Sequence, residues 1–138
     1  MKHIKLQFFA FITIITCITA ACSLDGDSDA NSCYRSGYAL TNSVTGPDST
    51  LVNKPITVNI SFKLENSCGA FVRLAETDGY PKTIYPVVEY NGCNCTTVST
   101  TLIKPYTFIA PAAGRYELKF VKDAQQQYLT KTIVVTAQ

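Results

Sequence analysis

The residues of this chain that are best suited to chemistry are its cysteines, of which the sequence has six. Thiols pair as disulfides, hold metal ions as thiolates, act as nucleophiles or carry lipids. Cys17 and Cys22 lie in or directly after an apolar N-terminal run, and four more follow it: Cys33, Cys68, Cys93 and Cys95. The two groups need separate interpretations.

Catalytic partners for these thiols are scarce. The single histidine, His3, lies at the N-terminus. A chain that loses it has no imidazole for a Ser-His-Asp or Cys-His pair and lacks the commonest transition-metal ligand. The seven glycines form neither a GxGxxG nor a GxxxxGK[ST] phosphate loop. We therefore predict that the protein is not an enzyme and that it uses no cofactor.

Residues 1–21 have the layout of an export signal. Lys2 and Lys5 precede an apolar stretch, Leu6 to Ala21, that ends in small residues. This stretch is shorter than the roughly 20 residues that a membrane-spanning helix needs. The sequence therefore predicts a signal peptide that is removed, rather than a permanent transmembrane anchor.

The end of that stretch, Thr19-Ala20-Ala21-Cys22, resembles the bacterial lipobox. The resemblance implies that Cys22 is diacylated, becomes the new N-terminus and attaches a lipoprotein to the membrane. Thr19 stands where the lipobox usually has leucine. The alternative is an ordinary signal peptide that is cut nearby, with Cys22 in a disulfide.

Residues 22–32 are predicted to be a flexible, acidic tether. After Leu24 they contain no bulky apolar residue, so they cannot bury enough surface to offset the entropy of ordering. Acidic residues behind a lipidated cysteine resemble the export signals of Bacteroidota lipoproteins, which implies the outer membrane and a surface-exposed position. A plain solvated linker is the alternative.

Export also changes the charge balance. The full chain has twelve Lys and Arg against ten Asp and Glu, and Lys2 and Lys5 account for the whole excess. The mature chain is therefore near neutral and lacks the positive surplus that nucleic-acid binding requires.

Residues 33–138 have the length of one small domain and an apolar period of two. In 55–64 the apolar positions are Ile56, Val58, Ile60, Phe62 and Leu64. Turn residues separate seven predicted strands, near 36–45, 55–64, 69–76, 83–90, 96–109, 115–122 and 128–136. Short strands with frequent turns predict an all-β sandwich or barrel.

One segment favours the sandwich. "YTFIAPAAGRYELKF", residues 106–120, resembles the late strands of bacterial immunoglobulin-like and fibronectin-like domains. The resemblance implies an immunoglobulin-like antiparallel β-sandwich of about seven strands. It also implies a tyrosine corner at Tyr116, with the ring in the core and the hydroxyl bound to backbone. The chain has no tryptophan, so the antibody-type Cys/Trp/Cys core is absent.

Four cysteines, an even number, remain for disulfides in an oxidising compartment. Strand directions place all four at one end of the sandwich, and Cys93 bonded to Cys95 would close a very tight loop. We favour Cys33 with Cys95 and Cys68 with Cys93, and the exchange of partners stays open. A tetrahedral thiolate metal site is the alternative, although zinc sites usually present wider cysteine spacings than C-x-C.

The segment "GYPKTIYPVVEYNG" supplies candidate binding residues, Tyr80, Tyr85 and Tyr90. Tyrosine offers apolar area with a polar tip, which suits interfaces and sugar faces. Pro81 and Pro86 indicate an edge strand or its approach. The alternative is that alternate members of this segment pack the core.

Two functions fit these features. The first is a non-enzymatic cell-surface lipoprotein whose immunoglobulin-like module binds a protein or glycan partner through edge strands, loops or the tyrosine-rich segment. The second is a structural accessory subunit of an outer-membrane assembly.

Overall fold

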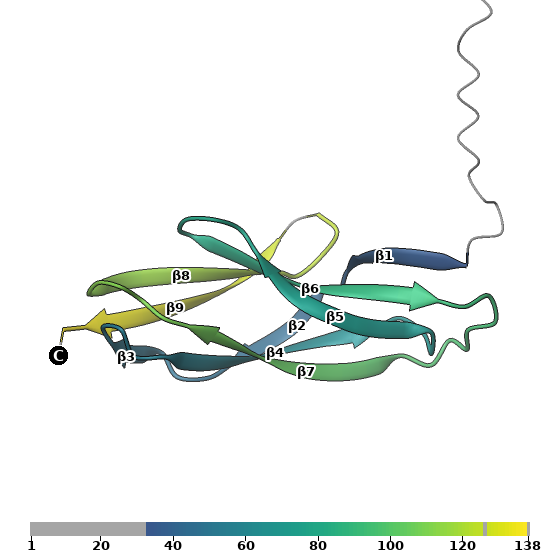
Figure 1. Cartoon of the computed structure of the whole chain (residues 1–138), viewed down its shortest axis with the longest axis horizontal. Coiled ribbons are helices and arrows are strands. Elements are labelled where there is room, and N and C mark those ends of the chain that lie inside the picture. Colours follow the sequence, from purple (N-terminus) through teal and green to yellow (C-terminus); the bar gives the residue numbers. More distant parts are fainter. Residues whose placement is uncertain (1–32, 126, 138) are drawn as a thin grey trace, which may run out of the picture. The chain divides into compact units, whose positions relative to one another are not determined.

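The computed structural model describes residues 33–125 and 127–137, and within these ranges the chain forms strands and no helix. The strands belong to two sheets that pack face to face (Figure 1). In chain order they are β1 (Tyr34–Tyr38), β2 (Thr41–Thr45), β3 (Ser49–Leu51), β4 (Ile56–Leu64), β5 (Gly69–Glu76), β6 (Lys82–Asn91), β7 (Thr100–Phe108), β8 (Gly114–Val121) and β9 (Tyr128–Thr136).

The larger sheet is built around β6. Strand β5 pairs with β6 over residues 84–90 and so occupies one edge of it. The other edge is shared, because β1 pairs antiparallel with residues 87–91 and β8 pairs parallel with residues 82–84. Strand β9 pairs with β8, and β3 pairs in parallel with β9. Strands β1 and β8 therefore meet end to end beside the middle of β6.

The smaller sheet has β4 at its centre, between β2 and β7, with antiparallel pairing throughout. The predicted alternation of β4 is confirmed, since its five apolar residues are buried and the residues between them are exposed or half-buried. They pack against the inward side chains of the larger sheet, which include Ile84, Val88, Leu118, Phe120 and Ile133. Each such side chain contributes about 1.5–3 kcal/mol when fully buried, so this layer holds the sheets together.

The predicted all-β, disulfide-stabilised sandwich is confirmed, with nine strands in place of about seven. The predicted strand 36–45 is two strands, because the chain passes from the larger to the smaller sheet at Ala39 and Leu40. The short β3 was not expected. Two parallel pairings, β3 with β9 and β6 with β8, make the larger sheet mixed rather than purely antiparallel.

The tyrosine corner is confirmed. The hydroxyl of Tyr116 donates a hydrogen bond to the backbone carbonyl of Ala112, with an oxygen–oxygen distance of 2.9 Å. The half-buried ring packs against the core and lies 5.4 Å, between centroids, from the ring of Phe108. The corner thus ties the connection between β7 and β8 to the end of the sandwich.

The interpretation of Pro86 as the mark of an edge strand is wrong, because β6 is paired on both sides. The carbonyl of Pro86 accepts a hydrogen bond from the N–H of Ala39, on the edge that β1 and β8 share. In a strand, the nitrogen of a residue faces the same edge as its carbonyl. The missing donor of Pro86 therefore faces the interval between the last residue of β1 and the last residue of β8, so no ladder hydrogen bond is lost.

Candidate functional site

The four cysteines of the domain lie at one end of it and form two disulfides. Cys33 is bonded to Cys93, and Cys68 is bonded to Cys95. The favoured pairing, Cys33 with Cys95 and Cys68 with Cys93, is therefore wrong, and the exchange that the sequence left open is the one present.

Local hydrogen bonds explain this connectivity. The N–H of Gly92 donates to the carbonyl of Cys33 as the β1–β6 pairing ends, which brings the next cysteine, Cys93, to Cys33. Cys95, two residues after Cys93, lies beside the turn between β4 and β5. There Ser67 and Thr96 exchange hydrogen bonds, and their neighbours Cys68 and Cys95 meet.

This end of the domain is tightly packed and serves the fold. Gly92 has a φ of 144°, and a Cβ there would lie 2.8 Å from the sulfur of Cys68, so only glycine fits. All four thiols are used in disulfides. Within residues 33–125 and 127–137 no three or more His, Cys, Asp or Glu side chains are grouped so that they could hold a metal ion.

The three candidate tyrosines do not form one site. Tyr80 lies in the β5–β6 turn, 48% exposed, with its ring against Phe108 and Tyr116. Tyr85 is half-buried on the outer face of β6, and Tyr90 is only 8% exposed and belongs to the core. Core packing, the alternative considered for this segment, therefore holds for Tyr90.

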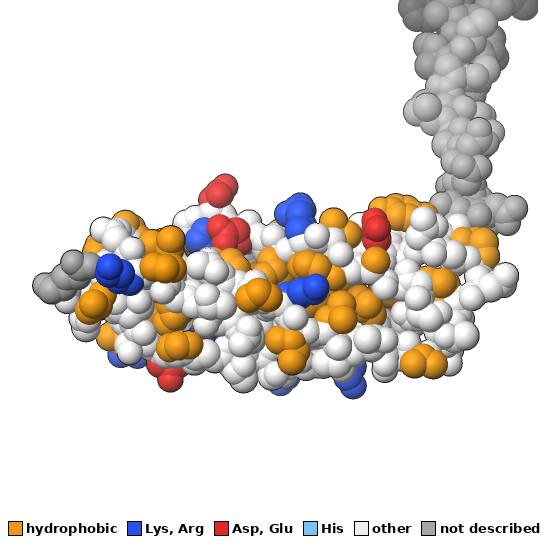
Figure 2. Space-filling model, turned by 60° about the horizontal axis from the view of Figure 1, so that its bottom comes forward, with side chains coloured by type: hydrophobic (Ala, Val, Ile, Leu, Met, Phe, Trp, Pro, Cys, Tyr) orange, Lys and Arg blue, Asp and Glu red, His pale blue; other side chains and the backbone are white. Residues whose placement is uncertain are grey.

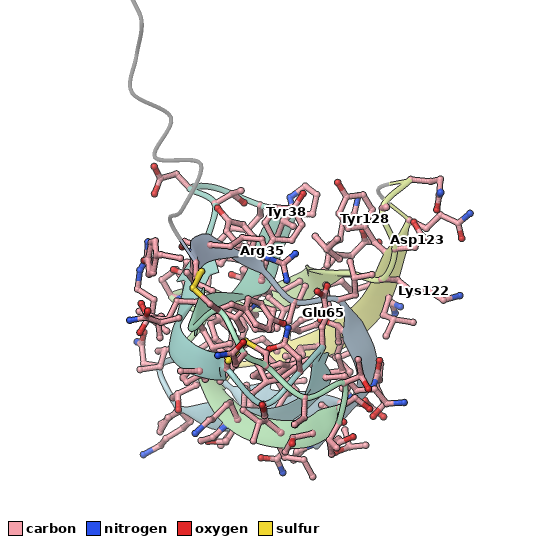
Figure 3. All side chains as sticks on the ribbon, turned by 90° about the vertical axis from the view of Figure 1, so that its right-hand side faces the viewer. Arg35, Tyr38, Glu65, Lys122, Asp123 and Tyr128 are labelled. Atoms are coloured by element: carbon pink, nitrogen blue, oxygen red, sulfur yellow. A yellow bond between two sulfur atoms is a disulfide. The ribbon has the colours of Figure 1, made fainter. Side chains whose placement is uncertain are left out.

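Tyr90 has a structural role at the disulfide end. Its hydroxyl accepts a hydrogen bond from the N–H of Glu65, and the guanidinium of Arg35 lies 4.4 Å from its ring centroid. Arg35 also forms a 2.6 Å ion pair with Glu65, toward which it points in Figure 3. The hydrogen bond to Glu65 raises the pKa of Arg35. These contacts join β1 to the end of β4.

The structure reveals a tyrosine-lined surface pocket that the sequence did not. It has a volume of about 180 Å3 and is lined by Tyr38, Thr83, Tyr85, Val121 and Tyr128. The rings of Tyr38 and Tyr85 have centroids 5.8 Å apart and are tilted by 58°. Tyr38 and Tyr128 are 56% and 42% exposed, and they lie on the same side of the domain in Figure 3. We call these five residues the tyrosine pocket.

The tyrosine pocket exists because β1 and β8 meet end to end beside β6. Tyr38 is the last residue of β1, and Val121 is the last residue of β8 and pairs with Tyr128 at the start of β9. Thr83 and Tyr85 come from the outward side of β6, at alternate positions. Residues far apart in the sequence are thus brought to one place by strand pairing, which local patterns do not indicate.

Hydroxyl groups are frequent on the whole outer face of the larger sheet. Their alternation and pairing place there Tyr34, Ser36, Tyr38, Thr83, Tyr85, Tyr128, Thr130 and Thr132. Charged residues share this face, among them Glu89, Arg115, Glu117 and Lys119. Glu89 accepts a hydrogen bond from Tyr34, and the ammonium of Lys119 lies 5.9 Å from the ring centroid of Tyr128. This face combines aromatic rings with hydrogen-bonding tips.

A second polar cluster joins the two sheets near the opposite end of β6. Glu76 of β5 accepts hydrogen bonds from the ammonium of Lys82, at 2.7 Å, and from the hydroxyl of Tyr106 on β7. The hydrogen bond from Lys82, followed by that from Tyr106, holds the pKa of Glu76 below its usual value. Burial and the same carboxylate raise the pKa of Tyr106. The cluster ties β5 to β7, and its groups are occupied with one another.

Strands β5 and β7 carry features that discourage pairing with another chain. Lys104 on β7 places its ammonium 4.9 Å from the ring centroid of Phe71, across the gap between the sheets, and Pro105 follows it. Strand β5 has a bulge between Phe71 and Arg73. Inward charges, prolines and bulges protect edge strands in natural sheets. A partner is therefore better accommodated on a face than on these edges.

The outer face of the smaller sheet is different in character. Its outward positions on β4 are Thr57, Asn59, Ser61 and Lys63, next to the isolated Ile103 of β7, which is 64% exposed. On the side that Figure 2 turns forward, apolar side chains are interspersed with polar ones and with Lys and Arg. None of these outward positions carries an aromatic ring of the kind that lines the tyrosine pocket.

Comparison of the chain with protein-family models, with characterised proteins and with solved structures found no match. The signal peptide, the lipidated Cys22 and the tether, all within 1–32, lie outside the described residues. In the part of the chain that is described, no helix is long and apolar enough to cross a membrane.

Proposed function

We propose that this protein is a non-enzymatic lipoprotein of the bacterial cell envelope, attached through Cys22, that binds a partner through the outer face of the larger sheet. Residues 1–21 are its signal peptide, and residues 22–32 hold the domain away from the outer membrane. The partner is a protein or a glycan.

The observation that carries the proposal is the tyrosine pocket. Exposed tyrosines are favourable binding residues, because they bury a large area at low entropic cost and offer a hydroxyl at the tip. Tyr38 and Tyr128 contribute little to the core, since about half of each side chain is exposed. Their concentration with Tyr85 around a pocket supports a role in recognition rather than in folding.

The test is affinity purification of the full-length protein from its own membranes in a gentle detergent. We expect a reproducible partner with the unaltered chain, and recovery reduced about fivefold or more by Tyr38→Ala, the effect of losing about 1 kcal/mol of binding free energy. Cys22→Ala is expected to release the protein from the membrane fraction.

The matched control is Ile103→Ala, which truncates a similarly exposed side chain on the smaller sheet. We expect it to leave recovery unchanged. Equal recovery with Tyr38→Ala and with the unaltered chain would refute the assigned face. Loss of the partner only with Ile103→Ala would instead favour an accessory subunit that is held through the smaller sheet.

A further inference from the structure

The tyrosine pocket is lined entirely by rings, hydroxyls and one aliphatic side chain. From its chemistry we infer that it binds one pyranose ring of a neutral glycan, an inference that rests on the proposed function and specifies its ligand. Three of its five residues are tyrosines, one is threonine, and none carries a charge.

The geometry suits a sugar ring. One face of a pyranose presents C–H bonds with a small positive partial charge, which pack favourably against the electron-rich face of an aromatic ring. Tyr38 and Tyr85, tilted by 58° with centroids 5.8 Å apart, form two walls of unequal orientation. Tyr128 lines the pocket from β9, so a ring that enters it meets aromatic surface from three strands.

The hydroxyl groups of the tyrosine pocket are also suited to binding a sugar. A sugar carries donors and acceptors around the edge of its ring, and burying them without partners would be unfavourable. The pocket offers three phenolic hydroxyls and the hydroxyl of Thr83, each of which can donate and accept. In the described part of the chain, the hydroxyls of Tyr38, Thr83, Tyr85 and Tyr128 make no hydrogen bond within the fold. Tyr38, Tyr85 and Tyr128 contribute ring contacts, and Thr83 bonds through its backbone to β8 and to Thr77.

The volume of the tyrosine pocket and the absence of charge in its lining further restrict the class of ligand. Pockets for drug-sized ligands have volumes of about 300–1,000 Å3, whereas this one has about 180 Å3 and therefore takes a single ring. An anionic sugar would need cationic partners, and the lining supplies none; Lys119 reaches only the ring of Tyr128, at 5.9 Å. The rest of the glycan would extend over the hydroxyl-rich face around the pocket.

The test is saturation-transfer difference NMR on the full chain, held in a polyoxyethylene detergent that contains no sugar. The probes are glucose, galactose, mannose, xylose and N-acetylglucosamine, with glucuronic and galacturonic acid as charged counterparts of the first two. We expect saturation to pass from tyrosine ring protons to the C–H protons of at least one neutral sugar. A uronic acid should give a weaker signal than its neutral counterpart.

Variants locate the binding. Tyr38→Ala and Tyr128→Ala should each reduce the signal about fivefold or more, which corresponds to a loss of about 1 kcal/mol. The matched control is Tyr34→Ala, on the same strand and the same face as Tyr38 but outside the pocket, and it should retain the signal. Thermal unfolding of each variant verifies that the fold is intact, as expected for half-exposed side chains.

Absence of saturation for every neutral sugar would overturn the inference. So would a signal that survives in Tyr38→Ala and Tyr128→Ala, or one that only the uronic acids give. The two proposals fail separately. If no sugar binds but Tyr38→Ala still abolishes recovery of a partner from membranes, the binding face stands and its ligand is a protein. If neither sugar nor partner depends on Tyr38, both proposals are wrong.

Discussion

The two disulfides offer the most quantitative prediction, because each closes a loop of known length. Cys33 and Cys93 are 60 residues apart, and Cys68 and Cys95 are 27 apart. In the chain-entropy account, loops of these lengths correspond to stabilisation of about 4.3 and about 3.5 kcal/mol. Small domains have total stabilities of about 5–15 kcal/mol, so either bond is a large share.

The assay is denaturant unfolding of the full chain and of double alanine variants, with free thiols counted by alkylation and mass. The variant without Cys33 and Cys93 and the variant without Cys68 and Cys95 each keep one disulfide. We expect both to fold, with the first slightly less stable than the second.

The decisive comparison is the crossed variant, which lacks Cys33 and Cys95. It breaks both bonds of the structure and leaves Cys68 and Cys93 without their partners. We expect it to unfold at the lowest denaturant concentration and to show two alkylated thiols beyond any at Cys17 or Cys22. A crossed variant as stable as the matched ones, without those free thiols, would refute the connectivity and the reasoning from strand register.

Three further predictions concern stability. Ile60→Ala, in a fully buried position, should cost about 2–5 kcal/mol in denaturant unfolding, whereas Ile103→Ala should change stability by about 0.5 kcal/mol or less. Tyr116→Phe removes the corner hydrogen bond and should cost about 1 kcal/mol. Because the pKa of Glu76 is lowered in the folded state, its contribution is present above the unfolded pKa and is lost as pH falls through the folded pKa. The stability difference between the unaltered chain and Glu76→Gln should therefore shrink on acidification below about pH 4.

For each of these three stability predictions, one result would contradict it. Equal effects at Ile60 and Ile103 would mean that the core is not where the structure places it. An unchanged stability in Tyr116→Phe would show that the hydroxyl is as well satisfied by water. A difference between Glu76→Gln and the unaltered chain that stays constant from pH 7 to pH 2 would contradict the role of the carboxylate in the cluster with Lys82.

The sequence was informative wherever a strand has one buried face. Alternation located β4, since each of its apolar residues points into the core. The Gly-x-Tyr pattern located the corner at Tyr116. The division between β1 and β2 was missed because all five residues of β1 are exposed and show no alternation. The pairing of β3 with β9 depends on residues more than eighty positions apart, which no local pattern reports.

The candidate binding site, too, was predictable from the sequence only in part. Tyr85 and Tyr90 are five residues apart on one strand, so a period of two places them on opposite faces, and this much could have been predicted. The proximity of Tyr38 and Tyr128 to Tyr85 could not have been predicted from local patterns. It follows from β1 and β8 sharing one edge of β6, a pairing set by tertiary structure.

The most direct test of the binding face is tyrosine nitration, mapped by mass spectrometry, in native membranes and in the purified chain. Tyr38, Tyr128 and Tyr80 are similarly exposed, at 56%, 42% and 48%, and Tyr80 lies outside the tyrosine pocket. We predict that Tyr38 and Tyr128 are nitrated more slowly in native membranes than in the purified chain, while Tyr80 reacts equally in both. Equal nitration of all three in both states would contradict the claim that a partner occupies this face.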